Sequence, residues 1–249
     1  MNIFKKLRLG FKMAMNNIRI VGGSSYTLHL AMASKILETP PEVLGDIIEC
    51  GTWKGGSAAN LSLVCKIVGR KLKIYDSFEG LPEIKSADQF AIVQLVKKGD
   101  YCGTLDEVKR NITKYGYIES CEFIKGWFSD TLPKLHSPVL LAFLDVDLVD
   151  SLDTCVKYIW PNLIEQGYIF TDEHHLLDYL ALFYSEKWWK INFNQTPPGL
   201  IGAGSGLPLG QFFIGPYSEM NDHPLQRTSS GTYTKKTLSA YWSYYPNEK

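Results

Sequence analysis

Hydrophobic and polar positions along this chain follow two alternating patterns. Short runs of β-branched and aromatic residues are separated by longer stretches in which apolar residues recur at helical spacing, as in a parallel sheet covered by helices. The runs that predict strands are 46–49, 72–76, 122–125, 139–145 and 168–171. The stretches that predict helices are 57–68, 105–115, 152–160 and 175–186, with Asp150 or Ser151 expected to cap the third.

The C-terminal third contains two more runs that predict strands, 188–193 and 211–214. The glycine- and proline-rich segment between them, 194–209, is too long for a tight hairpin and is typical of a lid or binding loop. We therefore expect an α/β fold with a doubly wound, mostly parallel sheet of seven strands. A single domain over 1–249 is expected, with a helical cap (1–44), a core (45–215) and a C-terminal tail (216–249).

Composition supports a sizeable core and disfavours some partners. Hydrophobic residues make up 45% and aromatic residues 13% of the chain, and 26 basic side chains balance 26 acidic ones. Without a global positive field, nucleic acid is not expected as a partner. The five cysteines are scattered and form no Cys-x-x-Cys pair. A zinc site or a disulfide framework is therefore not expected, and a reducing, cytoplasmic location is.

The N-terminal segment is basic and amphipathic, and it lacks the uninterrupted apolar stretch of a signal peptide. Its basic residues are Lys5, Lys6, Arg8, Lys12 and Arg19. One interpretation is a helix lying on an anionic membrane. The interpretation that we favour is a terminal helix that packs on its own domain or on a partner subunit, which leaves a homodimer open.

The most informative segment is the glycine-rich turn after the first predicted strand. The strand ends at Glu49, and glycines at 51, 55 and 56 precede a helix that is expected to begin near Ser57. Glycines let the backbone turn sharply and approach a ligand closely, and the helix N-terminus suits a carboxylate or phosphate. Asp76 ends the next strand, where an acid can accept hydrogen bonds from ribose hydroxyls. The pattern predicts a nucleoside-containing cofactor.

Acidic residues follow two further strands. Asp145 and Asp147 end the very apolar fourth strand, and Asp172 and Glu173 end the fifth. The carboxyl ends of adjacent parallel strands face the same crevice, and carboxylates gathered there repel one another unless a cation is present. Oxygen ligands in this arrangement predict Mg²⁺, with Mn²⁺ or Ca²⁺ as alternatives.

On these motifs the chain resembles the macrocin O-methyltransferases, which methylate sugar hydroxyls. The matching segments are GDIIECGTWKGGSA, DSFEGLPE, KGWFSDTLP, LDVDLVDS and GYIFTDE, in order across 45–173, about half of the chain. The resemblance implies the class I methyltransferase fold, whose sheet closes with a β–α–β–β ending and has an antiparallel last strand. It also implies S-adenosylmethionine as the methyl donor and a sugar hydroxyl of a glycoside or glycan as the acceptor.

The resemblance also assigns residues to the donor. Glu49, Gly51 and Ser57 would hold the methionine moiety, Asp76 the ribose, and the Gly126–Trp127 corner the adenine. The cofactor-binding set is then Glu49, Gly51, Thr52, Trp53, Ser57, Asp76, Ser77, Gly126, Trp127 and Asp145. The indole of Trp53 either makes a cation–π contact with the sulfonium or simply plugs the cleft, two interpretations that we weigh equally.

By similarity to this family, and to the more distant catechol O-methyltransferases, the metal ligands would be Asp145, Asp172 and Glu173. The chain departs from the family pattern, with Val146 between the two aspartates instead of glycine and Glu173 instead of a second aspartate. Histidines also follow where a tyrosine is common. Ligation by Glu173 is thus less secure than ligation by the aspartates.

The chain lacks the lysine that serves as the base in the catechol enzymes, because Leu148 occupies that place. His174 and His175 are candidate replacements, since imidazole titrates near neutrality, and at most one of two adjacent side chains should face the site. We expect His174 to be the catalytic base, with Asp147 as the alternative.

Two other functions remain open. Asp145-Val146-Asp147 matches the low-specificity DxD motif of metal-dependent glycosyltransferases, although that interpretation leaves the glycine turn and the second acidic pair unexplained. A binding or assembly subunit with this fold but without turnover is the other alternative.

Overall fold

The computed structural model describes residues 1–84, 96–173, 176–203, 207–208 and 229–237. The longer helices are α1 (Ile3–Arg19), α2 (Tyr26–Glu38), α3 (Gly56–Val68), α4 (Leu105–Tyr115), α6 (Val149–Asn162) and α8 (Glu186–Phe193). Shorter helical turns are η3 (Ile118–Ser120), α5 (Phe128–Thr131), η4 (Leu132–Lys134), α7 (Leu177–Ala181) and η5 (Leu182–Tyr184). The strands are β1 (Asp46–Cys50), β2 (Leu72–Asp76), β3 (Cys121–Lys125), β4 (Val139–Leu144), β5 (Leu163–Thr171), β6 (Leu207–Pro208), β7 (Ser229–Ser230) and β8 (Thr232–Lys235).

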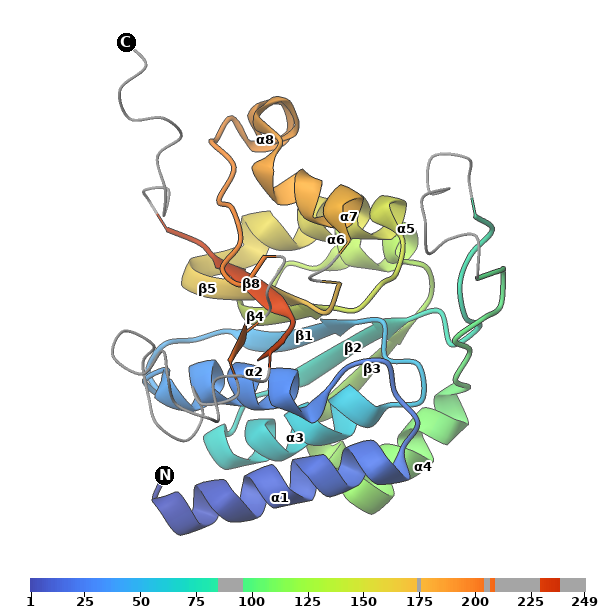
Figure 1. The fold of residues 1–249 in the computed structure, drawn as a ribbon, viewed down its shortest axis with the longest axis vertical. Coiled ribbons are helices and arrows are strands. Elements are labelled where there is room, and N and C mark those ends of the chain that lie inside the picture. The colour runs from blue at the N-terminus through green and yellow to red at the C-terminus, as the bar shows by residue number, and fades with distance from the viewer. Residues whose placement is uncertain (85–95, 174–175, 204–206, 209–228, 238–249) are drawn as a thin grey trace.

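The main sheet has six strands among the described residues, in the order β3-β2-β1-β4-β5-β8 (Figure 1). Strands β1 to β5 pair in parallel, and β8 runs antiparallel to β5. The chain order reverses between β1 and β4, so the carboxyl ends of these two strands border the crevice in which such sheets bind ligands. The predicted α/β fold with an antiparallel last strand is confirmed.

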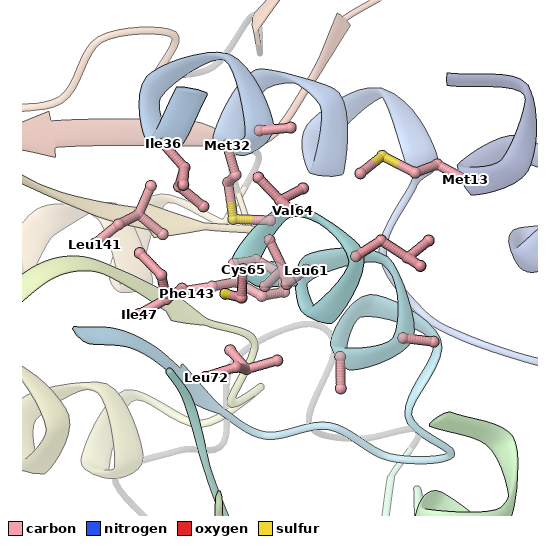
Figure 2. Close-up of a cluster of buried hydrophobic side chains, with 14 of the residues drawn as sticks. Met13, Met32, Ile36, Ile47, Leu61, Val64, Cys65, Leu72, Leu141 and Phe143 are labelled. Atoms are coloured by element: carbon pink, nitrogen blue, oxygen red, sulfur yellow. The ribbon is translucent and has the colours of Figure 1, made fainter. Parts of the chain in front are cut away.

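Helices cover both faces of the sheet and bury a separate apolar cluster on each. Ile47 belongs to the cluster under α2 and α3, while its neighbour Ile48 belongs to the cluster under α6. Figure 2 shows the first cluster, in which Met32 and Val64 from the helices meet Phe143 from β4. Because successive strand residues point to opposite faces, a strand buried on both sides is apolar throughout, as β4 is.

The end of the sheet differs from the sequence-based expectation. Residues 188–193, predicted as a strand, lie in helix α8, whose N-cap Ser185 accepts a hydrogen bond from the backbone N–H of Trp188. The predicted strand 211–214 lies outside the described residues. The antiparallel strand is instead β8, which lies within the range that we assign to the C-terminal tail. The expected cap of α6 is also wrong, because Leu148 is its N-cap and Asp150 and Ser151 lie inside the helix.

The N-terminal helix packs on its own domain, as we expect. Leu9 and Met13 of α1 are buried in the cluster shared with α2 and α3. The opposite side of α1 leaves Phe4 and Phe11 exposed. Within the described residues, no helix combines the length and the apolar character needed to cross a bilayer.

Candidate functional site

A cavity of about 250 Å³ opens at the carboxyl ends of β1, β2, β4 and β5. Nine of the ten expected cofactor residues line it, as do the three expected metal ligands and Asp147. The expected residue that does not line the cavity is Glu49. His174 and His175 lie outside the described residues, so the expectation for His174 stays a prediction. The fold therefore brings the glycine turn and the acidic strand ends into one space.

The turn after β1 depends on Gly51. Its φ of 81° lies in the left-handed region, and a Cβ atom there would lie 1.9 Å from the carbonyl oxygen of Asp145. The backbone N–H of Asp145 donates to the carbonyl oxygen of Cys50 at 3.0 Å. Only glycine permits this approach of two chain segments, which joins the cofactor turn to the acidic end of β4.

Helix α3 presents an uncapped N-terminus to the cavity. Its N-cap is Gly55, in a left-handed conformation, and no side chain makes a capping hydrogen bond there. Gly56 and Ser57 of the first turn line the cavity, and Ser57 is buried. Free backbone N–H groups, the helix dipole and a serine hydroxyl together suit an anionic group such as a carboxylate.

Glu49 lies beneath this turn and is fully buried. It alternates with Ile48 and Cys50 along β1, so it faces the side of the sheet covered by α3. Neither of its carboxylate oxygens has a hydrogen-bond partner among the described residues. Burial raises the pKa of Glu49 to about 8, and the nearby hydroxyls of Ser57 and Thr52 offset only part of that rise. An orphaned buried carboxyl is costly unless a ligand supplies a donor.

Asp76 links the ends of β1 and β2 and also faces the cavity. Its two oxygens accept the backbone N–H of Thr52 at 2.8 Å and that of Phe78 at 2.6 Å. Burial raises its pKa, and these hydrogen bonds partly oppose the rise. Ser77 also lines the cavity, but its hydroxyl is engaged in a local turn, where it donates to the carbonyl oxygen of Gly80 at 3.0 Å. Asp76 therefore shapes the turn and keeps lone pairs for a ligand.

Aromatic side chains form part of the cavity wall. Trp53 meets Tyr101 edge to face, with ring centroids 5.1 Å apart. Trp127, which follows Gly126 after β3, is 37% exposed at the cavity edge. These flat surfaces suit an adenine or a sugar ring. The two interpretations of Trp53, as a sulfonium contact or as a plug, both remain compatible with its place in the wall.

Three carboxyl groups gather at the ends of β4 and β5. One oxygen atom each from Asp145, Asp147 and Glu173 lies within 4.8 Å of the others. Glu173 is held in place because its Oε2 accepts the Thr171 hydroxyl at 2.9 Å and its Oε1 accepts the backbone N–H of Asp147 at 3.4 Å. Asp172 lines the same cavity but does not belong to this group of three. The group found in the structure therefore contains Asp147 in the place expected for Asp172.

Burial and mutual repulsion raise the pKa values of all three carboxyl groups. The pKa of Glu173 rises to about 8 and that of Asp147 to about 6, in each case first through burial and then through neighbouring carboxylates. The pKa of Asp145 also rises, through burial and the charges of Glu173 and Asp172. A divalent cation would relieve this repulsion, and these oxygen atoms are ligands that Mg²⁺ prefers.

Part of the cavity wall comes from the N-terminal helices, which the motifs do not reveal. Asn17 of α1, Ser24 of the α1–α2 connection and His29 of α2 line it. His29 is buried, and burial lowers its pKa to about 3. The sequence signal was a histidine between two apolar residues, Leu28 and Leu30, in the first half of α2. Tyr101 also lines the cavity, beside the charge of Asp147.

Comparison with known proteins assigns this arrangement to a family. Residues 26–189 match the family model described as macrocin-O-methyltransferase (TylF). The 8-demethyl-8-(2,3-dimethoxy-alpha-L-rhamnosyl)-tetracenomycin-C 4'-O-methyltransferase of Streptomyces olivaceus is 33% identical over 141 residues, 53% of this chain and 54% of that protein. The demethyldecarbamoylnovobiocin O-methyltransferase of Streptomyces niveus is 28% identical over 141 residues, 53% of each protein. The chain spans about half the length of the curated relatives it matches.

A solved structure supports the fold. The O-methyltransferase NovP superposes with a TM-score of 0.63 at 21% identity, covering 84% of this chain and 80% of that one. At this identity the likeness shows the fold alone, which is that of the class I methyltransferases. The sequence match, which covers more than half of the chain, shows that this protein belongs to the macrocin O-methyltransferase family.

Proposed function

We propose that this protein transfers a methyl group from S-adenosylmethionine to a sugar hydroxyl of a glycoside or glycan, with the help of a divalent cation. The observation that carries the proposal is a single cavity that joins the α3 turn to the carboxylates after β4 and β5. The sugar acceptor is taken from the family and from relatives such as the one named for a rhamnosyl tetracenomycin. Five free cysteines fit action in the reducing cytoplasm.

The cavity fits the donor at several points. The orphaned carboxylate of Glu49 lies below the α3 turn and can accept hydrogen bonds from an ammonium group. The uncapped N-terminus of α3, with Ser57, suits the carboxylate of the same amino-acid moiety. Asp76 at the end of β2 suits the ribose hydroxyls. The wall formed by Trp127 and Gly126 suits the adenine ring.

The acidic group fits a hard divalent cation, most simply Mg²⁺. Asp145 and Glu173 belong both to the expected ligand set and to the group of neighbouring oxygens, so we assign them first. We assign Asp172, which lines the same cavity, as the third protein ligand. A cation held there would lower the pKa of an acceptor hydroxyl and orient it toward the methyl group.

Asp147 is our candidate for the proton acceptor among the described residues. In the reaction, the acceptor oxygen bonds to the methyl carbon while the carbon–sulfur bond breaks, and the hydroxyl proton must pass to a base. Asp147 lies within 4.8 Å of the proposed ligands Asp145 and Glu173, and its pKa of about 6 leaves it ionised at neutral pH. Its φ of 57° is uncommon outside glycine and fixes its direction at the cavity.

The test combines binding with transfer. The protein should bind S-adenosylhomocysteine and Mn²⁺ by calorimetry, and should transfer a labelled methyl group to deoxysugar glycosides in a reaction that a chelator stops. Asp172→Asn should weaken Mn²⁺ binding, whereas Asp147→Asn should lower kcat by roughly 100-fold or more with Mn²⁺ affinity retained. If Asp147→Asn loses the metal instead, Asp147 is a ligand and the base must be sought elsewhere.

Two outcomes would contradict the proposal itself. Binding of a nucleotide sugar in preference to S-adenosylhomocysteine would favour the DxD glycosyltransferase. Binding of donor and cation without transfer to any hydroxyl acceptor would favour a non-catalytic subunit. Full activity in the presence of the chelator would show that the reaction needs no divalent cation, and the methyltransferase assignment would stand without it.

A further inference from the structure

A buried chain of polar side chains connects the N-terminal helices to α3. The Nδ2 of Asn16 donates to the Oδ1 of Asn60 at 2.9 Å, and the Nδ2 of Asn60 lies 2.9 Å from the Nδ1 of His29. The Nε2 of His29 lies 3.0 Å from the Oγ of Ser24. Asn16, Asn60 and His29 retain almost no exposed surface. The Oδ1 of Asn16 has no partner among the described residues, whereas the hydrogen bonds named here fix how the other groups of the network are oriented.

The neighbours of Asn60 determine where the proton of His29 lies. The Nδ2 of Asn60 also points at the carbonyl oxygen of Met13, at 3.3 Å, and a carbonyl can only accept a hydrogen bond. The group that faces the Nδ1 of His29 is therefore the Asn60 NH₂, so Nδ1 is an acceptor. In a neutral imidazole the proton then resides on Nε2 and is donated to Ser24.

Because His29 donates its Nε2 proton to Ser24, the hydroxyl proton of Ser24 is left free for a ligand. The Oγ of Ser24 accepts from His29, and no second hydrogen bond of this hydroxyl occurs within the described residues. Ser24 is only 6% exposed, and it lines the cavity. A buried hydroxyl with a free proton, beside a cavity, is a directed donor for an acceptor atom inside it.

The position of the α1–α2 connection indicates which acceptor that is. Ile20, just before the connection, packs against Gly56 in the first turn of α3, where a Cβ atom would lie 3.7 Å away. Gly23 borders the acidic end of β4, where its Cβ would lie 4.0 Å from the Oδ2 of Asp145. The connection therefore spans the space between the N-terminus of α3 and the acidic group. Ser24, which follows Gly23 in the connection and lines the cavity, can donate into this space.

We infer that Ser24 is a ligand of the donor's amino-acid moiety, and that its hydroxyl donates to the same carboxylate that α3 receives. His29 is a positioning residue, which acts by directing the Ser24 hydroxyl, and Asn60 acts by selecting the tautomer of His29. This inference rests on the proposed use of S-adenosylmethionine. It makes the two N-terminal helices part of the cofactor site.

The test compares two ligands that differ in the amino-acid moiety. Ser24→Ala should weaken binding of S-adenosylhomocysteine by roughly 10- to 100-fold, as for a lost hydrogen bond to a charged group. Binding of 5′-methylthioadenosine, which lacks the amino-acid moiety, should stay within about twofold. Ser24→Thr, which keeps a hydroxyl, should retain affinity. The matched control is Ser34→Ala, which removes a buried serine of α2 that bonds to Glu38 and does not line the cavity.

The outcomes separate this inference from the proposed function. If the wild-type protein binds neither ligand, the proposed function fails. If the wild-type protein binds S-adenosylhomocysteine and Ser24→Ala binds it equally well, Ser24 is not a ligand and the inference fails alone. Equal weakening for both ligands would assign Ser24 to the packing of the cavity and would also overturn the inference.

The positioning role of His29 has its own readout. His29→Leu should weaken S-adenosylhomocysteine binding when Ser24 is present, yet add less than about twofold in the Ser24→Ala background. Equal effects in both backgrounds would indicate a purely structural role. Should His29→Leu fail to fold, ¹⁵N spectra of the wild-type imidazole decide. Protonated Nε2 with unprotonated Nδ1 is expected, and the opposite tautomer would overturn the assignment.

Discussion

At the scale of single residues, Glu49 shows how a binding group is kept at the expense of stability. It is fully buried, its oxygens have no partner among the described residues, and burial raises its pKa to about 8. A carboxyl whose pKa is raised on folding favours the folded state less as the pH rises through and above its ordinary value. Near neutral pH the carboxyl of the free protein is therefore mostly protonated, and the donor's ammonium group would stabilise its ionised form.

We predict that Glu49→Gln stabilises the free protein and weakens donor binding. Since the amide carries no charge to bury, the variant should be about 1–3 kcal/mol more stable at pH 8, with little difference near pH 4.5. Its affinity for S-adenosylhomocysteine should fall at least about tenfold. Urea unfolding at both pH values, with calorimetry, measures the two effects. A variant that is less stable at pH 8 would show that Glu49 has a partner in the free protein.

At the scale of helices and strands, the site depends on how closely the ends of β1 and β4 approach each other. Gly51 and Gly69 both have φ near 70–80°, but only Gly51 meets another backbone, since a Cβ atom there would lie 1.9 Å from the Asp145 carbonyl oxygen. Nothing lies within 4 Å of such a Cβ at Gly69. Comparing an alanine substitution at Gly69 with one at Gly51 therefore separates the free-energy cost of a left-handed conformation from the cost of a steric clash.

We predict that Gly69→Ala costs about 1 kcal/mol, the cost of the left-handed conformation alone. Gly51→Ala should cost roughly 3 kcal/mol or more, because the end of β1 must also move away from β4. Urea unfolding measures both, and donor binding should fall only for Gly51→Ala. Equal costs would mean that the turn after β1 relaxes freely, contrary to its role in the site.

The sequence predicts some helices and strands accurately and others wrongly, and local sequence features explain the difference. The strand 72–76 and the helix 105–115 match the structure residue for residue, because turn signals and a capping threonine mark their limits. The segment 188–193 is rich in aromatic residues and resembles a strand. A strand would place Trp189 and Ile191 on one face, yet Trp189 is buried and Ile191 is 71% exposed, as helical spacing requires.

At the scale of the whole molecule, three carboxyl groups from two strands make stability depend on pH and on cations. The pKa of Glu173 is raised to about 8 and that of Asp147 to about 6. In the folded state these groups bind protons more tightly than in the unfolded chain. Without a cation, stability should therefore fall as the pH rises from about 4.5 toward 8. A cation held by Asp145, Asp172 and Glu173 would replace the proton of Glu173 and lower the pKa of the nearby Asp147, so its stabilising effect should grow with pH.

We predict that Mg²⁺ raises the Tm by several degrees at about pH 8 and by much less at about pH 5.5, where protons compete for the same oxygens. Thermal unfolding with chelator or with excess Mg²⁺ at both pH values measures this. Glu173→Gln should reduce both the pH dependence and the response to Mg²⁺. A response to Mg²⁺ that is equal at both pH values would argue against a cation at this group.

The sequence by itself determined local features of this protein: the five parallel strands, the glycine turn and the acids that end β4 and β5. Parallel topology then requires neighbouring strand ends to share one edge, so their meeting in a cavity was predictable. Only the tertiary structure decided that Glu49 lies below the cavity, that Asp147 joins Asp145 and Glu173, and that β8 completes the sheet. The same holds for Ser24 of the α1–α2 connection and His29 of α2, which reach the cavity from outside the sheet. Local patterns encode periodicity and turns, whereas distances between remote segments depend on how side chains pack.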